Sequence, residues 1–217
     1  MHKYKCILFD FDGTVVNTGM GILRSLQYSF EKMGQRIPDM EELKRFIGPP
    51  VYYSFTHFYG ISDDEVGDYI KRYRERYKEK GIYESELYAG MKELLIDLKK
   101  KGILLGVASS KPEHLIYSVA DFLGITDLFD VIVGVKTDDS NHSSKTGLIL
   151  EAMENLAISD RNEVLMVGDR CFDIDGATGA QVDSCGALWG FGNKEEFIEH
   201  NATYIAENPA DIINMLL

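Results

Sequence analysis

Ile7-Leu8-Phe9-Asp10-Phe11-Asp12-Gly13-Thr14 joins an apolar run to two carboxylates, a glycine and a hydroxyl. The apolar part is typical of a buried strand, and Asp12-Gly13 is typical of a turn. In an extended backbone, residues two apart point to the same side about 6 to 7 Å apart, so Asp10 and Asp12 bring like charges together. A divalent cation or a shared proton would stabilise that pair, whereas a plain Asx turn would explain Asp12 without any ligand.

The composition limits the class of protein. With 217 residues, the chain has room for one large domain or for a domain with a substantial insertion. No apolar run reaches the roughly 18 residues that span a bilayer, and the first residues do not form a secretion signal, so we expect a cytoplasmic protein without a membrane partner. The cysteines at positions 6, 171 and 185 lack the spacing of a disulfide framework or a zinc site. A net charge of -12 argues against nucleic acid as a partner.

The periodicity of apolar residues divides the chain into two parts. Residues 15–86 show helical spacing throughout, whereas helices and strands alternate from residue 88 onward. The alternation predicts a parallel sheet covered by helices on both faces, with the helical block inserted over the carboxyl end of the first strand. We therefore expect an α/β core domain of residues 1–14 and 87–217, and a cap domain of residues 15–86. The expected strands are 103–108, 131–133, 164–167 and 182–188, and the expected core helices include 91–101, 113–123 and 147–156.

Polar residues stand where these strands end. Ser109 and Ser110 follow the second strand, and Asp169 follows the fourth directly after an apolar run, with Asp173 four residues later. Ligands of open parallel sheets bind at the carboxyl ends of the strands, so these side chains are candidates for one site. Helix capping would explain the serines and Asp173, but a buried strand end gives an unpaired Asp169 a heavy desolvation cost.

These residues resemble the motifs of the haloacid dehalogenase superfamily, in the same order along nearly the whole chain. Asp10-Phe11-Asp12-Gly13-Thr14 is similar to the first motif, Ser109 to the second, Lys145 to the third, and Gly168-Asp169 with Asp173 to the fourth. The resemblance implies a Rossmann-like three-layer core with strand order 3-2-1-4-5 and a helical cap. Two shorter stretches resemble the phosphoglycolate phosphatase-like branch, namely Phe46-Ile47-Gly48-Pro49-Pro50 and Trp189-Gly190-Phe191-Gly192.

The resemblance implies phosphoryl transfer with two catalytic carboxylates. Asp10 would attack phosphorus and form an aspartyl-phosphate, and Asp12 would protonate the leaving oxygen and then deprotonate the attacking water. Family members that cleave carbon–halogen bonds lack an acid at the position of Asp12, so its presence favours phosphate chemistry.

The same resemblance implies the other groups of the site. Mg²⁺ would be held by the side chains of Asp10 and Asp169 and by the carbonyl of Asp12. The expected phosphate-binding residues are Thr14, Ser109, Ser110 and Lys145, with backbone N–H groups near Gly13, while Asp173 would anchor Lys145 or a metal-bound water. Relatives often carry proline after the third-motif lysine, but Thr146 follows here, so Lys136 and Lys111 stay open as alternatives to Lys145.

The cap would select the leaving group, because the core contacts only the phosphoryl group. Arg45 and Gly48, near the Gly48-Pro49-Pro50 turn, are the candidate substrate contacts. Lysines and arginines interleave with Tyr69, Tyr73 and Tyr77, which invites a nucleic-acid interpretation. The tyrosines repeat every four residues, however, and this spacing favours a packed stripe on one helix face.

Three classes of function remain open from the sequence. The first is a Mg²⁺-dependent phosphatase of a small phosphorylated metabolite, phosphoglycolate-like or a nucleoside monophosphate, with inorganic pyrophosphate as an alternative substrate. The second is a phosphomutase similar to β-phosphoglucomutase, which would return the phosphoryl group to sugar. The third is a binding protein that keeps the fold without turnover. The sequence leaves both a monomer and a homodimer open.

Overall fold

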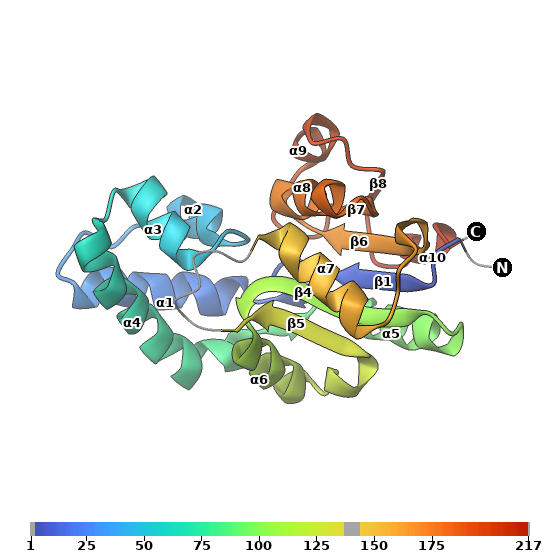
Figure 1. Cartoon of the computed structure of the whole chain (residues 1–217). Coiled ribbons are helices and arrows are strands. Elements are labelled where there is room, and N and C mark those ends of the chain that lie inside the picture. The colour runs from blue at the N-terminus through green and yellow to red at the C-terminus, as the bar shows by residue number, and fades with distance from the viewer. Residues whose placement is uncertain (1–2, 137–143, 217) are drawn as a thin grey trace.

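A six-stranded parallel sheet forms the centre of the protein (Figure 1). The structure, a computed structural model, describes residues 3–136 and 144–216. The expected strand order 3-2-1-4-5 is confirmed, and a further edge strand, β8, was not predicted. In spatial order, the strands are β5 (Val131–Val135), β4 (Leu104–Pro112), β1 (Cys6–Phe9), β6 (Val164–Gly168), β7 (Asp183–Ala187) and β8 (Tyr204–Ala206).

Both faces of the sheet are buried, and β1 shows why. Successive side chains of a strand point to opposite faces. Ile7 and Phe9 belong to one apolar cluster, whereas Cys6 and Leu8 belong to a second cluster on the other face. All four side chains are buried. A strand covered on both faces reads as a continuous apolar run, which is the pattern that the sequence shows before Asp10.

Helices supply the two covering layers. α7 and α8 contribute to the cluster around Leu8, and α5, α6 and α10 to the cluster around Phe9. No helix in the described ranges has the length and apolar character needed to cross a membrane. The helices of the core are α5 (Met91–Lys100), α6 (Glu113–Leu123), α7 (Lys145–Asn155), α8 (Cys171–Ala180), α9 (Lys194–Glu199) and α10 (Asp211–Asn214).

A cap of helices lies beyond the carboxyl ends of the strands, on the side toward which the arrows of Figure 1 point. Its interior is aromatic: the ring of Phe30 lies 5.6 Å from that of Tyr69 and 5.7 Å from that of Phe55, measured between centroids. Tyr69 and Tyr77 are buried, which confirms the predicted packing stripe. The cap contains α1 (Gly19–Lys32), α2 (Met40–Leu43), the 3₁₀ turn η1 (Lys44–Phe46), α3 (Val51–Tyr59) and α4 (Asp63–Glu79).

The expectation that residues 15–86 are wholly helical was wrong at both ends. β2 (Val16–Asn17) pairs antiparallel with β3 (Glu86–Leu87), so the segments that enter and leave the cap form a short two-stranded sheet. Two segments of two residues each carry no strand signal of their own. Their pairing comes from the fold, which brings the two connections side by side, where each satisfies backbone groups of the other.

We predict opposite effects on stability for the same change at two glycines. A Cβ at Gly106 in β4 would lie 2.6 Å from Leu8 Cδ2 and 2.8 Å from Val131 Cγ1, so Gly106→Ala should destabilise the protein by about 1–3 kcal/mol. A Cβ at Gly67 in α4 would meet nothing within 4 Å, so Gly67→Ala should stabilise it by about 1 kcal/mol through helix propensity. Urea unfolding measures both, and shifts of the same sign would contradict this packing.

Candidate active site

Asp10 is the first residue after β1 and lies at the carboxyl edge of the sheet. Its N–H donates to Val167 O at 2.8 Å, which continues the pairing of β1 with β6 by one residue. The side chain is 4% exposed, and its Oδ1 accepts a hydrogen bond from Lys145 Nζ at 2.7 Å. The backbone thus fixes this carboxylate at the centre of the sheet edge, where it contacts the ammonium group of Lys145.

The turn after Asp10 requires glycine at position 13. Gly13 has φ +88°, and a Cβ there would lie 2.2 Å from Asp169 Oδ2. Its N–H donates to Val16 O at 2.8 Å and closes the turn. The expectation that backbone N–H groups near Gly13 bind phosphate stays a prediction. Thr14 differs from the expectation, because its fully buried hydroxyl donates to Asp169 Oδ1 at 3.1 Å instead of lining a pocket. Gly13 therefore leaves room for the Asp169 carboxylate, and Thr14 orients it by a hydrogen bond.

Three buried carboxylates meet at this edge. One oxygen each of Asp10, Asp169 and Asp173 lies within 4.8 Å of the others. Burial raises the pKa of Asp169 well above its usual value, and the neighbouring Asp173 and Asp10 add to the rise. Burial likewise raises the pKa of Asp173, to about 6, against the opposing effect of Lys145. Three carboxyl groups thus share one lysine, which disfavours full ionisation of all three.

Lys145 is the lysine that the fold places against Asp10. Its Nζ also contacts Asp173 Oδ1 at 2.8 Å and donates to Ala108 O at 3.0 Å. Burial lowers its pKa, but the two carboxylates raise the pKa by more, so the ammonium form is favoured. Gly176 of α8 makes room for this side chain, because a Cβ there would lie 2.4 Å from Lys145 Cγ.

The two alternative lysines lie elsewhere. Lys136 forms ion pairs with Glu113 and Glu151 and is 55% exposed. Lys111 is buried, and its Nζ donates to Asp12 Oδ2 at 2.9 Å and Oδ1 at 3.1 Å. Of the three lysines, Lys145 is the one that contacts Asp10.

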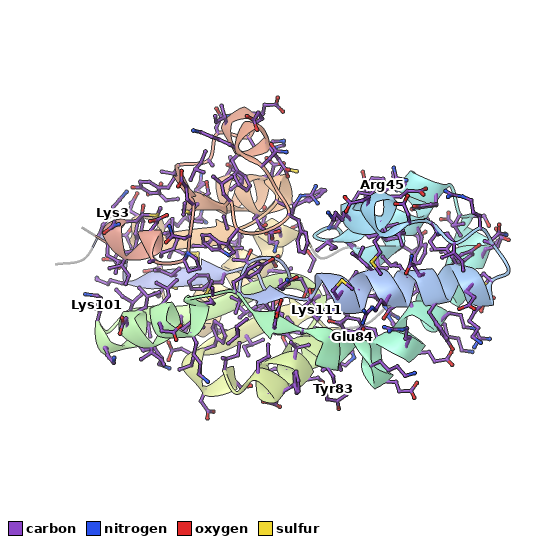
Figure 2. All side chains as sticks on the ribbon, turned by 180° about the vertical axis from the view of Figure 1, so that it is seen from behind. Lys3, Arg45, Tyr83, Glu84, Lys101 and Lys111 are labelled. Atoms are coloured by element: carbon purple, nitrogen blue, oxygen red, sulfur yellow. The ribbon has the colours of Figure 1, made fainter. Side chains whose placement is uncertain are left out.

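Lys111 also connects the core to the cap. Its Nζ donates to the hydroxyl of Tyr77 in α4 at 2.7 Å, and Figure 2 shows Lys111 at the junction of the two parts. The sequence predicts Tyr77 as a packing residue and gives no sign that its hydroxyl accepts a hydrogen bond from Lys111. Its four-residue spacing from Tyr73 indicates burial and carries no signal for this longer-range contact.

A pocket between cap and core collects most of the remaining predicted residues. It holds about 970 Å³ of empty space, part of which is open to solvent. Ser109 is buried, and its Oγ accepts from Lys111 N at 3.3 Å. The predicted residues that line the pocket are Asp10, Asp12, Gly48, Ser109 and Ser110, and they are joined by Phe46, Tyr52, Ile70, Tyr73, Arg74 and Lys111.

Arg45 does not line this pocket, contrary to our expectation. Its guanidinium carbon lies 5.0 Å from the ring centroids of Phe58 and Tyr59, and it donates to Phe58 O at 3.2 Å. Figure 2 shows it on the cap, apart from Lys111. Stacking on two aromatic rings explains the position of this cation. Among the cap cations, Arg74 is the one that the pocket reaches.

The Trp189-Gly190-Phe191-Gly192 loop encloses Asp169. Phe191 N donates to Asp169 Oδ2 at 2.9 Å, and the indole N–H of Trp189 donates to Thr14 O at 2.9 Å. A Cβ at Gly190 would lie 2.3 Å from Asp169 Cβ, so the glycine permits this close approach. In the sequence this loop was identified only by its resemblance to the phosphoglycolate phosphatase-like branch. In the structure it orients the buried carboxylate of Asp169.

Comparisons with known proteins agree with this arrangement. A 5'-nucleotidase from Pseudomonas aeruginosa is 33% identical over 99% of this chain and 96% of its own length. A tyrosine-protein kinase from Mycobacterium tuberculosis is 32% identical over 95% of this chain and 69% of its own. The crystal structure of a predicted phosphatase from Clostridium acetobutylicum superposes with a TM-score of 0.92, at 34% identity and 97% coverage of both chains. Residues 7–187 match the model of the haloacid dehalogenase-like hydrolases, and the chain belongs to that family.

Proposed function

We propose that this protein is a Mg²⁺-dependent phosphatase that hydrolyses a small phosphomonoester through an aspartyl-phosphate. The observation that carries the proposal is the position of Asp10, which lies at the end of the central strand, against Lys145, and lines the pocket together with Asp12. A buried nucleophile, a cation for the phosphoryl oxygens and a second carboxyl group for proton transfer are the parts that this chemistry needs.

The reaction proceeds in two steps at Asp10. We assign the attack on phosphorus to Asp10 Oδ2, because Lys145 already binds Oδ1. An O–P bond forms, the bond from phosphorus to the leaving oxygen breaks, and Asp12 gives that oxygen its proton. In the second step Asp12 takes a proton from water as the water oxygen attacks phosphorus. The acyl-phosphate bond then breaks and frees inorganic phosphate and the carboxylate of Asp10.

The side chains around the two carboxylates hold these groups in place. Lys145 and Ser109 would bind the phosphoryl oxygens, whose charge increases toward the transition state. Lys111 donates to both carboxylate oxygens of Asp12, which fixes the orientation of this side chain at the pocket wall. The cap closes the pocket on the side of the leaving group and reduces the access of bulk water.

The donor set fits a magnesium ion. Carboxylate and carbonyl oxygens are the ligands that Mg²⁺ prefers, and the buried carboxylates of Asp10 and Asp169 supply the negative charge that a divalent cation balances. We propose that these two side chains and the carbonyl of Asp12 hold it, while Lys145 and the N–H of Arg170 engage Asp173. Bound there, Mg²⁺ would offset the repulsion between the carboxylates and a phosphate dianion.

The pocket favours a nucleoside monophosphate over phosphoglycolate as substrate. Phe46, Tyr52 and Tyr73 give it aromatic walls, and Arg74 with Lys111 adds positive charge. A nucleobase could stack on these rings, whereas phosphoglycolate has no ring with which to use them. The nucleotidase from P. aeruginosa supports the same choice.

A phosphomutase is the alternative function on the same core. It would need to exclude water from the second step, so stoichiometric release of inorganic phosphate would rule it out.

The first prediction concerns turnover of a substrate panel. Phosphate release from nucleoside monophosphates, phosphoglycolate and pyrophosphate should require Mg²⁺ and be fastest for a nucleoside monophosphate. Asp10→Asn should abolish it, because the amide is not a nucleophile. The matched control is Asp97→Asn, which removes an exposed carboxylate paired with Lys100. Turnover that survives in Asp10→Asn would refute the aspartyl-phosphate, and a preference for pyrophosphate would replace the proposed substrate.

The second prediction separates the two roles of Asp12. Asp12→Asn should lower turnover of an alkyl phosphate by about 10²- to 10⁴-fold, because no acid protonates the alkoxide. With p-nitrophenyl phosphate the leaving phenolate needs no proton, so a first-turnover burst of p-nitrophenol should persist while later turnovers slow. Stopped-flow absorbance measures both phases. Equal steady-state rates for wild type and variant would contradict both roles.

The third prediction concerns stability without metal. Burial raises the pKa of Asp169 well above its usual value, so folding opposes the charged form of this carboxyl group. In EDTA at pH 7, Asp169→Asn should therefore raise the free energy of unfolding by about 1 kcal/mol or more. Added Mg²⁺ should stabilise wild type by about 2.7 kcal/mol at one hundred times its dissociation constant, and the variant by much less.

The pH dependence of unfolding checks the sign of this effect. A carboxyl group with a raised pKa binds protons more tightly in the folded than in the unfolded state, so stability increases as pH falls through the folded pKa toward the unfolded pKa. With the pKa of Asp173 raised from 3.8 to about 6, metal-free wild type should gain stability as pH falls from about 7 to about 5, and Asp169→Asn should gain less. A metal-free wild type that loses stability over this range would contradict the assignment.

A further inference from the structure

Arg170 joins the metal-binding loop of the core to the cap. It follows Asp169 directly and caps the start of α8. Its Nη1 donates to Ile47 O in the cap at 2.8 Å, and its side chain is 19% exposed. A charged donor that is mostly withdrawn from water makes a stronger hydrogen bond than an exposed one, so this contact is a substantial link between the two parts.

The cap side of the contact is shaped to receive the arginine. Gly48 follows Ile47 with φ +107°, a conformation that disfavours residues with a Cβ. A Cβ at Gly48 would also lie 2.8 Å from Arg170 Cγ, so the stem of the arginine occupies the space that glycine leaves open. Glycine is therefore favoured at this position for two reasons: it adopts the positive φ angle, and it leaves space for the Arg170 side chain.

The core side holds the arginine in one direction. Glu196 Oε1 accepts from Arg170 Nε at 3.1 Å and also from Cys171 N at 2.6 Å. The backbone N–H of Arg170 donates to Asp173 Oδ2 at 3.0 Å. With the backbone and one face of the guanidinium fixed by carboxylates, Nη1 is left to reach the carbonyl of Ile47.

The segment that Arg170 holds is a wall of the substrate pocket. Phe46, Gly48, Pro49 and Pro50 line the pocket, whereas neither Arg170 nor Ile47 is among the described residues that line it. Gly48 and Pro50 also border a second cavity that reaches Lys145. Arg170 thus contacts the turn on the side that faces away from the pocket. It can affect substrate binding only by changing the position of residues 46–50.

We propose that Arg170 is a positioning residue, which holds the 46–50 turn of the cap against the core and so sets the shape of the pocket around the leaving group. The proposal rests on the proposed function for its effect on substrate, but the hold on the turn is independent of it. Lys111 and Tyr77 form a separate contact between core and cap, so loss of the Arg170 contact loosens the turn without freeing the cap.

The test compares three variants at this contact with a matched control. Arg170→Met keeps the stem beside Gly48 and removes every donor, Arg170→Lys restores a charge and one donor group, and Glu196→Gln removes the orienting charge. Arg72→Met makes the same change at an exposed arginine of α4 that pairs with Glu75. Hydrogen–deuterium exchange of the turn, including the Ile47 amide that donates to Lys44 O, is measured without substrate.

We expect exchange of the turn to accelerate about tenfold in Arg170→Met, less in Glu196→Gln and least in Arg170→Lys, with Arg72→Met unchanged. A charged hydrogen bond of this kind shifts an equilibrium by roughly tenfold or more. For a nucleoside monophosphate, KM should rise about tenfold in Arg170→Met. For acetyl phosphate, whose leaving group is too small to reach the wall, kcat and KM should change less than twofold.

Unchanged exchange of the turn in a folded Arg170→Met would overturn the proposal, as would equal acceleration in Arg72→Met. An equal loss of kcat for both substrates with unchanged exchange would assign Arg170 to the chemistry itself and would also overturn it. If Arg170→Met fails to fold, Glu196→Gln and Arg170→Lys decide by the same exchange measurement. If wild type hydrolyses no substrate, the proposed function fails, while exchange still decides the hold on the turn.

Discussion

Three carboxylates and one ammonium group share a buried space at the carboxyl end of the sheet, and much of the surrounding structure serves to keep them there. Asp10, Asp169 and Asp173 would repel one another in the absence of Lys145. The glycines at positions 13, 168 and 190 have no Cβ because a carboxylate occupies that space. Hydrogen bonds from Thr14 and Phe191 orient Asp169. The folded chain therefore holds unfavourable electrostatic energy at this point, which a bound cation would relieve.

The cap meets this charged centre on two sides. On one side Lys111 joins Asp12 to the hydroxyl of Tyr77, and on the other Arg170 joins the loop of Asp169 to Ile47. Each contact pairs a cation of the core with an oxygen of the cap. Each cation also forms an ion pair within the core, Lys111 with Asp12 and Arg170 with Glu196. The pocket between cap and core lies between the two contacts, so its walls depend in part on Tyr77 and Arg170, which do not line it.

The sequence predicted those parts of the molecule that local patterns specify. The apolar run before Asp10 identified the central strand, and the alternation after residue 88 predicted the parallel sheet. The correct strand order came from the resemblance to the haloacid dehalogenase motifs. β8 and the β2–β3 pair were missed because strands of two or three residues lack a periodic signal and depend on their neighbours. The residues around Asp10 were brought together as the motif order implied. The environments of Thr14, Arg45 and Tyr77 were not predicted, because each depends on a partner distant in the sequence.

The pairing of β2 with β3 places the two ends of the cap next to each other. Val16 lies opposite Leu87, and paired residues of antiparallel strands are only about 4.5–5.5 Å apart. Seen from the sheet, the whole cap therefore occupies the position of a single surface loop. Insertions with adjacent ends disturb a host fold little, because they impose almost no separation on the chain that carries them. A lineage with this core could lengthen, replace or shorten its cap while the hydrolytic centre stays intact, so selectivity and reactivity can evolve as separate traits.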